Sequence, residues 1–273
     1  MKIINLIEDT KGIEGCVYEH GLSFYIETKN HKILMDTGAT DAFLENAKVL
    51  NVDLAKVDTV IISHGHYDHT GGLLAFAKLN PEAKIYIQKS AQGDFYNYRN
   101  QEEKYIGMDK KIAELSQVVF LEGDLEIDQE LSIFTDVTGR KLWPKGNEIL
   151  KKKCGNEFLQ DDFCHEQYLV VTEDDKRVLL SGCAHNGILN ILERYTELFK
   201  NNPTHVISGF HMMKKKDEYT AEDTQMIEET ARILGKMDTV FYSGHCTGEY
   251  PLQVLKGIME NNLTEIHSGD QVF

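Results

Sequence analysis

The sequence predicts an α+β fold in which two mixed β-sheets pack against each other and helices cover their outer faces. Short apolar, β-branched runs come early in each half of the chain, and segments with helical periodicity come late. This order is typical of two sheets that share a core, with helices outside them. Several apolar runs also end in small clusters of glycine and histidine, which places polar chemistry at the ends of strands.

In the first half, strands are predicted wherever a short apolar run stops at turn residues. These runs cover residues 1–6, 21–27, 32–36, 57–62, 84–88, 118–121 and 125–134. His31 lies in the turn between the second and third runs and is expected to face solvent. Helices are predicted over 41–50 and 73–79, the first because its apolar residues recur on one helical face.

Two segments have no clear period. Residues 90–116 mix aromatic side chains with charges, so they form either a lid or substrate wall or padding for the core. Residues 138–163 are the least regular part of the chain. The lysine run 151–153 within them is predicted to lie in a solvated loop, with attraction of an anionic substrate as the alternative.

Regular patterns return in the second half. Strands are predicted over 168–172, 177–181, 205–208 and 239–242, and helices over 187–200, 220–234 and 252–259. The last residues, 266–273, are expected to add backbone to the edge of a sheet.

The composition indicates one domain over residues 1–273, with the lid candidate at 90–116 as an insertion. Four prolines and the lack of a Gly/Ser-rich stretch argue against a flexible linker. The N-terminus does not resemble a signal peptide, and no apolar run approaches the length of a membrane span. Five scattered cysteines without a C-x-x-C pair are typical of a reducing compartment, so a cytoplasmic location is expected.

The formal net charge is −15, from 44 acidic and 29 basic residues. Such a surface repels nucleic acid and anionic membranes, so neither is expected as a partner. A small phosphorylated substrate is still compatible, because bound cations reverse the local field at a site. The sequence does not define the oligomeric state.

The segment Ser63–Gly72 concentrates metal-binding chemistry. It contains His64, His66, Asp68 and His69, directly after an apolar run. Alternate side chains of an extended chain share a face, so His64, His66 and Asp68 are expected to converge, with His69 at the following turn. Imidazole and carboxylate are ligands of zinc, iron and manganese. A polar loop whose histidines cluster by chance is the alternative, and the density of such residues argues against it.

Three later apolar runs end in Gly-Cys-Ala-His-Asn-Gly (182–187), Gly-Phe-His (209–211) and Gly-His-Cys-Thr-Gly (244–248). The H-x-H-x-D-H pattern at 64–69 resembles the metallo-β-lactamase-fold superfamily. Together with Glu-His-Gly-Leu-Ser at 19–23, the later clusters resemble the subgroup named for dihydropterin-ribofuranosylaminobenzene 5′-phosphate synthase.

The resemblance implies an αββα four-layer sandwich that holds two divalent transition-metal ions, zinc in the first place and iron or manganese otherwise. His245 matches the last metal histidine of the superfamily. His185 is the favoured third ligand of the first metal, and His165 is the alternative. Cys183 takes the place of the usual bridging aspartate, as a thiolate ligand or as an inert buried thiol. Asp36 is expected to hold the histidines of the metal loop in their tautomers without binding the metal itself.

The same resemblance implies a metal-dependent hydrolase that uses a metal-activated water on a small phosphorylated ester or phosphodiester. Asp68 and His211 are the expected catalytic residues, and His20 and His211 are expected to contact substrate. The alternative is a transferase that condenses a dihydropterin-methyl diphosphate with an arylamine. The two are distinguished by whether turnover needs an amine acceptor.

Overall fold

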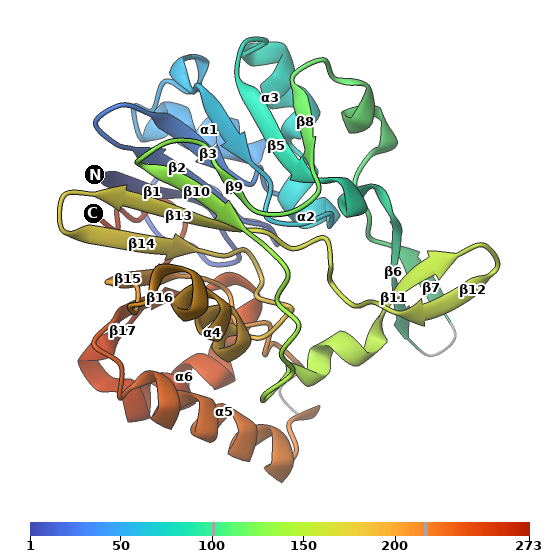
Figure 1. Ribbon diagram of the computed structural model, residues 1–273, viewed down its shortest axis with the longest axis vertical. Coiled ribbons are helices and arrows are strands. Elements are labelled where there is room, and N and C mark those ends of the chain that lie inside the picture. The colour runs from blue at the N-terminus through green and yellow to red at the C-terminus, as the bar shows by residue number, and fades with distance from the viewer. Residues whose placement is uncertain (100–101, 216–217) are drawn as a thin grey trace.

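The computed structural model describes residues 1–99, 102–215 and 218–273. Two β-sheets pack face to face, and helices cover the outer face of each (Figure 1). The expected αββα arrangement is therefore confirmed. None of the helices in the described part of the chain combines the length and the apolar composition needed to cross a membrane.

The first half of the chain builds the first sheet. Its strands, in spatial order, are β1 (Lys2–Ile7), β2 (Ser23–Glu27), β3 (Lys32–Met35), β4 (Thr59–Ile61), β5 (Lys84–Gln88) and β8 (Val118–Leu121). Its outer face carries α1 (Ala42–Val49) and α3 (Leu73–Leu79), whose Phe43 and Phe76 are fully buried against it. The short α2 (Tyr67–Thr70) follows β4.

The second half builds the second sheet. Its strands, in spatial order, are β17 (Leu263–Glu265), β16 (Val240–Ser243), β15 (His205–Ile207), β14 (Lys176–Leu180), β13 (Tyr168–Glu173), β10 (Leu131–Phe134) and β9 (Leu125–Glu126). The helices α4 (Ile188–Phe199), α5 (Ala221–Leu234) and α6 (Glu249–Met259) belong to the same half. The predicted edge backbone at the C-terminus is confirmed, because Gln271 pairs with Ile4 of β1.

Both sheets are buried on two faces because their strands alternate between two apolar layers. In β3, Ile33 and Met35 point into the layer between the sheets, whereas Leu34 points to the helices. In β14, Val178 and Leu180 enter the layer between the sheets. This alternation explains why these strands read as continuous apolar runs in the sequence.

A third, smaller sheet projects beside the sandwich (Figure 1). It consists of β12 (Glu157–Gln160), β11 (Leu150–Cys154), β6 (Asp94–Arg99) and β7 (Glu102–Tyr105). The lid candidate 90–116 therefore contributes two of its strands, although residues 100 and 101 lie outside the described residues. Short 3₁₀ helices are η1 (Leu54–Lys56), η2 (Lys89–Gln92), η3 (Lys110–Glu114), η4 (Lys145–Ile149), η6 (His245–Thr247) and η7 (Glu260–Asn262).

The prediction of a solvated loop for the lysine run is wrong. Lys151, Lys152 and Lys153 lie in β11, which is hydrogen-bonded between β6 and β12. The Lys153 ammonium has aromatic partners there, since its Nζ lies 5.6 Å from the centre of the Tyr96 ring and 5.1 Å from that of the Phe158 ring. Lysine was compatible with the strand because its stem packs while its charge stays in water.

The prediction that His31 faces solvent is also wrong. Its Nδ1 lies 2.9 Å from Asp58 and its Nε2 lies 2.6 Å from Asp128, so the ring links the β2–β3 turn to two other loops. Burial alone would lower the pKa of His31, but the hydrogen bonds to the two carboxylates outweigh burial and raise it. A proton on this ring is thus more stable in the folded than in the unfolded chain.

Replacing His31 with alanine is expected to cost about 1–2 kcal/mol of unfolding free energy near pH 6, and less at higher pH. The folded pKa lies above the unfolded value of 6.5. The contribution is therefore complete below that value and is lost as the pH rises through the folded pKa. Urea unfolding of both proteins at pH 6 and pH 9 measures the difference. An equal cost at the two pH values would contradict the charged-ring explanation.

Candidate metal centre

The loop after β4 is fixed by a buried aspartate from the neighbouring strand. Since β3 and β4 are parallel, Asp36 at the end of β3 lies beside Ser63 at the end of β4. The Asp36 carboxylate accepts hydrogen bonds from the Ser63 backbone N–H at 2.7 Å, the Ser63 hydroxyl at 2.6 Å and the His69 Nδ1 at 2.6 Å. Asp36 thereby holds both ends of the metal-type motif in place.

The first group of potential ligands contains three buried histidines. The His64 Nε2 and the His66 Nδ1 lie 3.0 Å apart, as expected for side chains two residues apart in extended backbone. His185, from the loop after β14, brings its ring centroid within 4.9 Å of both other rings. The geometry brings these three imidazoles together.

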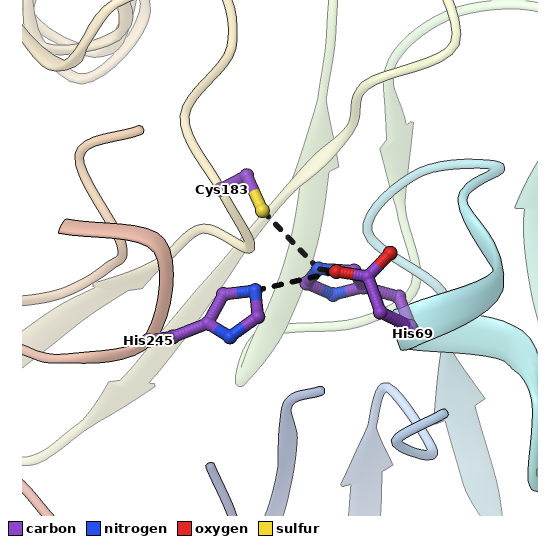
Figure 2. Close-up of side chains that lie close together, drawn as sticks. His69, Cys183 and His245 are labelled. Carbon is purple, nitrogen blue, oxygen red and sulfur yellow. Dashed lines mark hydrogen bonds and ion pairs between the residues drawn. The ribbon is translucent and has the colours of Figure 1, made fainter. Parts of the chain in front are cut away.

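The second group contains Asp68, His69, Cys183 and His245, whose ligand atoms lie within 4.8 Å of one another. Figure 2 shows Cys183, His69 and His245 approaching one another from separate segments of the chain. The expected convergence of Asp68 with His64 and His66 by strand alternation is not what the structure shows. Asp68 lies in α2, and this helical turn places it beside His69 in the second group.

Cys183 lies where the two groups meet. Its Sγ is 3.2 Å from the His69 Nε2, and it also lies within 4.8 Å of a ring nitrogen of His64 and of His185. Its thiol is buried. A side chain shared by both groups occupies the position that a bridging ligand would need.

The histidine tautomers suit metal binding. The Nδ1 atoms of His64, His69, His185 and His245 each have an acceptor: Ser63 Oγ at 2.9 Å, Asp36 at 2.6 Å, Asn147 Oδ1 at 2.9 Å and Asp9 at 2.6 Å. Each ring therefore presents its Nε2 to the centre, which is how supporting hydrogen bonds orient metal-binding histidines. The buried Nε2 atoms of His185 and His245 have no hydrogen-bond partner among the described residues. These residues fit divalent metal ions.

The charges of the three histidines in the first group agree with this. Burial lowers the pKa of His64 and His185, and it lowers that of His66 to about 3, so all three are neutral at pH 7. Neutral imidazole is the form that binds metal. For Asp68, burial favours the protonated acid, but the adjacent His69 and His245 outweigh it and hold the pKa well below its usual value. Asp68 is therefore an anion.

His165 is placed differently from His185. Its Nδ1 accepts a hydrogen bond from the Gly65 backbone N–H at 3.1 Å, and its Nε2 lies 3.2 Å from Asp161. Both ring nitrogens are thus engaged, although Asp161, His165 and His66 also form a group close enough to hold an ion. The Nε2 of His185 has no hydrogen-bond partner among the described residues, which favours His185 as the third ligand of the first group.

A cavity of about 650 Å³ opens onto both groups. Its lining includes His66, Asp68, Cys183 and His185. His20 and His211, the two residues expected to contact substrate, line it as well. His20 lies at the surface, hydrogen-bonded to Asp9 at 2.9 Å, and the His211 ring lies 4.1 Å from that of His185. The structure thus places both next to the potential ligands.

The wall of this cavity is rich in cations. It contains Arg99, Lys104, Lys145, Lys214 and Lys215. Three of these have carboxylate partners: Arg99 pairs with Glu218, Lys145 with Glu222 and Lys214 with Asp223. The Lys104 ammonium lies 5.4 Å from the centre of the Tyr67 ring. A basic wall in a chain of net charge −15 provides a local surface for an anion.

Sequence reasoning missed three residues of the centre. Asp9 binds His245 and His20. The Asn147 side chain accepts a hydrogen bond from the His185 Nδ1 and donates one to the His185 carbonyl. Cys246 lies beside Cys183, with its Sγ 3.6 Å from the Cys183 carbonyl oxygen. Asp9 follows a buried strand, so the strand-end rule could have found it. Asn147 lies in the irregular segment 138–163, where no pattern indicated a role.

Comparison with known proteins supports the same fold. The model of the metallo-β-lactamase superfamily matches residues 18–143. The chain is 26% identical to the 7,8-dihydropterin-6-methyl-4-(β-D-ribofuranosyl)-aminobenzene-5′-phosphate synthase of Methanocaldococcus jannaschii, over 98% of this chain and 95% of that protein.

Two solved structures extend the comparison. One, described as a metal-dependent hydrolase of the β-lactamase superfamily, is 29% identical, with a TM-score of 0.83 over 100% of this chain and 98% of the other. Zinc-bound PqqB from Methylobacterium extorquens is 10% identical, with a TM-score of 0.58 over 100% of both chains, and shares the fold. The arrangement of strand-end histidines on an αββα sandwich and these similarities lead to one conclusion: the chain has the metallo-β-lactamase fold, and its residues 18–143 match the model of that superfamily.

Proposed function

We propose that the protein is a metal-dependent hydrolase that acts on a small phosphorylated ester or phosphodiester. The observation that carries the proposal is that the buried Nε2 atoms of His185 and His245 have no hydrogen-bond partners among the described residues, while both histidines belong to groups of potential ligands that share Cys183, a residue of the cavity lining. We assign His64, His66 and His185 to one divalent ion and Asp68, His69 and His245 to a second, with Cys183 between them. Zinc suits this mixture of nitrogen, oxygen and sulfur ligands.

Two divalent ions at these positions supply water activation at neutral pH and positive charge against a developing oxyanion. The protein's own residues orient the ligands and supply the proton. Asp36, Asn147 and Asp9 hold the ligand rings in orientation through their Nδ1 atoms. His211, beside the first group, donates a proton to the leaving group. His20 lines the same cavity and contacts the substrate.

The cations of the cavity wall support an anionic substrate. Arg99 and Lys104 come from the small sheet, and Lys145, Lys214 and Lys215 come from segments of the second half. A phosphate group gains charge-assisted hydrogen bonds from such side chains.

A second candidate function is a transferase that joins a dihydropterin-methyl diphosphate to an arylamine. Its support is the similarity to the named synthase over nearly the whole of both chains. The same centre serves either reaction, since cations against phosphate oxygens favour displacement by water and by an amine alike.

Elemental analysis of the purified protein, followed by a panel of phosphoesters with and without an arylamine, tests the proposal. Hydrolysis predicts metal in the protein and turnover in water alone. Turnover of a diphosphate ester that requires the amine supports the transferase instead. Protein that takes up no divalent metal, even after addition of zinc, iron or manganese, contradicts both.

Replacing Lys104 with methionine is expected to raise KM for a phosphorylated substrate about tenfold and to leave kcat nearly unchanged. The substitution removes a charge that binds substrate, but it leaves the ligand groups in place. Steady-state kinetics measures both constants. The matched control is Lys151→Met, in β11 of the same small sheet, because Lys151 itself does not line the cavity. Equal effects of the two substitutions would show that overall charge, not local contact, is responsible.

A further inference from the structure

A second sulfur lies beside the two ligand groups. Cys183 and Cys246 are both free thiols and both buried. Their Sγ atoms and a ring nitrogen of His211 lie within 4.8 Å of one another. The proposed function assigns a role to Cys183 and to His211 but none to Cys246. The three side chains form a compact set of two sulfurs and one nitrogen, called here the thiol set.

The thiol set is held by three loops that are hydrogen-bonded to one another. These loops follow β14, β15 and β16, which are parallel neighbours, so their carboxyl ends meet at one edge of the sheet. The Gly209 N–H donates to the Gly182 carbonyl at 2.8 Å, and the Met213 N–H donates to the Cys246 carbonyl at 2.9 Å. Neither contact depends on the thiols, so the backbone fixes their spacing beforehand.

The local backbone also leaves room for the thiol set. A side chain at position 209 would bring its Cβ within 2.6 Å of the Cys246 Sγ, so only glycine leaves room for the sulfur. His211 and His245 adopt the left-handed conformation, with φ of 48° and 47°, which is uncommon outside glycine. Residues held in such conformations cluster at functional sites because the surrounding structure has to maintain them.

The donor atoms suit one class of ligand. In a tetrahedral zinc site the ligand atoms are about 3.6–3.8 Å apart, given Zn–S of about 2.3 Å and Zn–N of about 2.0–2.1 Å. Adjustments of about 1 Å or less would therefore close the thiol set around an ion. Sulfur donors favour soft and borderline metals such as zinc or cadmium over magnesium, calcium and manganese. All three residues line the cavity, which leaves a fourth position open towards it.

We propose that Cys183, His211 and Cys246 form an inhibitory site for a third metal ion of soft or borderline character. The ion shares the Cys183 sulfur with the main centre. It also binds one ring nitrogen of His211, and that nitrogen can then no longer carry the proton that goes to the leaving group. The binding step is independent of the reaction catalysed, whereas the inhibition rests on the proposed function, in which His211 is the proton donor.

Cadmium titration of the wild-type protein and of Cys246→Ser tests the binding step. Wild type is expected to take up about one ion per chain more than the variant and to show about twice the sulfur-to-cadmium charge-transfer absorbance, since the variant keeps one of two thiolates. His211→Gln is a second variant expected to lose the third ion. Cys164→Ser, which removes an exposed thiol, is the matched control and should behave as wild type.

Equal uptake and equal absorbance in wild type and Cys246→Ser would overturn the site while leaving the main centre intact. A thiol count in denaturant that shows Cys183 and Cys246 as a disulfide would also overturn it. Failure of the proposed function has a different signature, because wild type would then bind no metal at all. Excess zinc is expected to inhibit turnover by wild type and not by Cys246→Ser. Equal inhibition of both would overturn the inhibitory role.

Discussion

Replacing His185 with alanine is expected to lower the affinity for the first metal ion by about 100-fold or more, whereas His165→Ala leaves the metal content near that of wild type. Loss of a supporting hydrogen bond already costs about 10–100-fold in metal affinity, and loss of a ligand exceeds that. His185 presents an Nε2 that has no hydrogen-bond partner in the described part of the chain. Both nitrogens of His165 are engaged, with Gly65 and Asp161.

Competition with a chromophoric chelator measures the affinity of both variants. The comparison is well matched, because both residues are buried histidines within reach of the same His66 ring. His165→Ala serves as the control for the loss of a buried imidazole. If it loses the metal and His185→Ala keeps it, the ion lies in the group of His66, Asp161 and His165, and His185 becomes a substrate-side residue.

Much of this centre was visible in the sequence because its residues follow a simple topological rule. Parallel strands end at one edge of a sheet, so polar residues directly after apolar runs meet there. His64, His185, His211 and His245 all obey this rule, and each of them belongs to a group of potential ligands that includes Cys183. The alternation rule located His66 beside His64 for the same reason.

The rule does not find residues of the centre that come from helical turns or from segments without periodicity. Asp68 could not be placed by strand alternation because α2 begins at Tyr67, and a four-residue helix leaves little trace in a sequence. Asn147 reaches His185 from a segment without periodicity. The lysine run 151–153 has the sequence pattern of a loop, because a charged short strand in a small, exposed sheet has the same composition as a solvated turn.

Asp36 is the residue on which the loop after β4 depends. Its side chain is fully buried and accepts three hydrogen bonds, two from Ser63 and one from His69. Its backbone is left-handed, with φ of 58°. Asparagine tolerates that conformation better than alanine does, so Asp36→Asn changes the hydrogen bonding with little backbone cost, and Asp36→Ala adds the backbone cost.

Asp36→Ala is expected to cost about 3–5 kcal/mol of unfolding free energy, because it leaves three buried donors without their acceptor. Asp36→Asn should cost less, since its carbonyl oxygen still accepts part of the set. It should nevertheless lower metal affinity about 10–100-fold, because the His69 ring loses the carboxylate that orients it. Urea unfolding of metal-free protein measures the first effect, and chelator competition measures the second. Asp41→Asn, an exposed aspartate whose side chain makes no capping hydrogen bond at the start of α1, is the control and should stay within about 0.5 kcal/mol of wild type. Wild-type metal affinity in Asp36→Asn would show that His69 is held without this carboxylate.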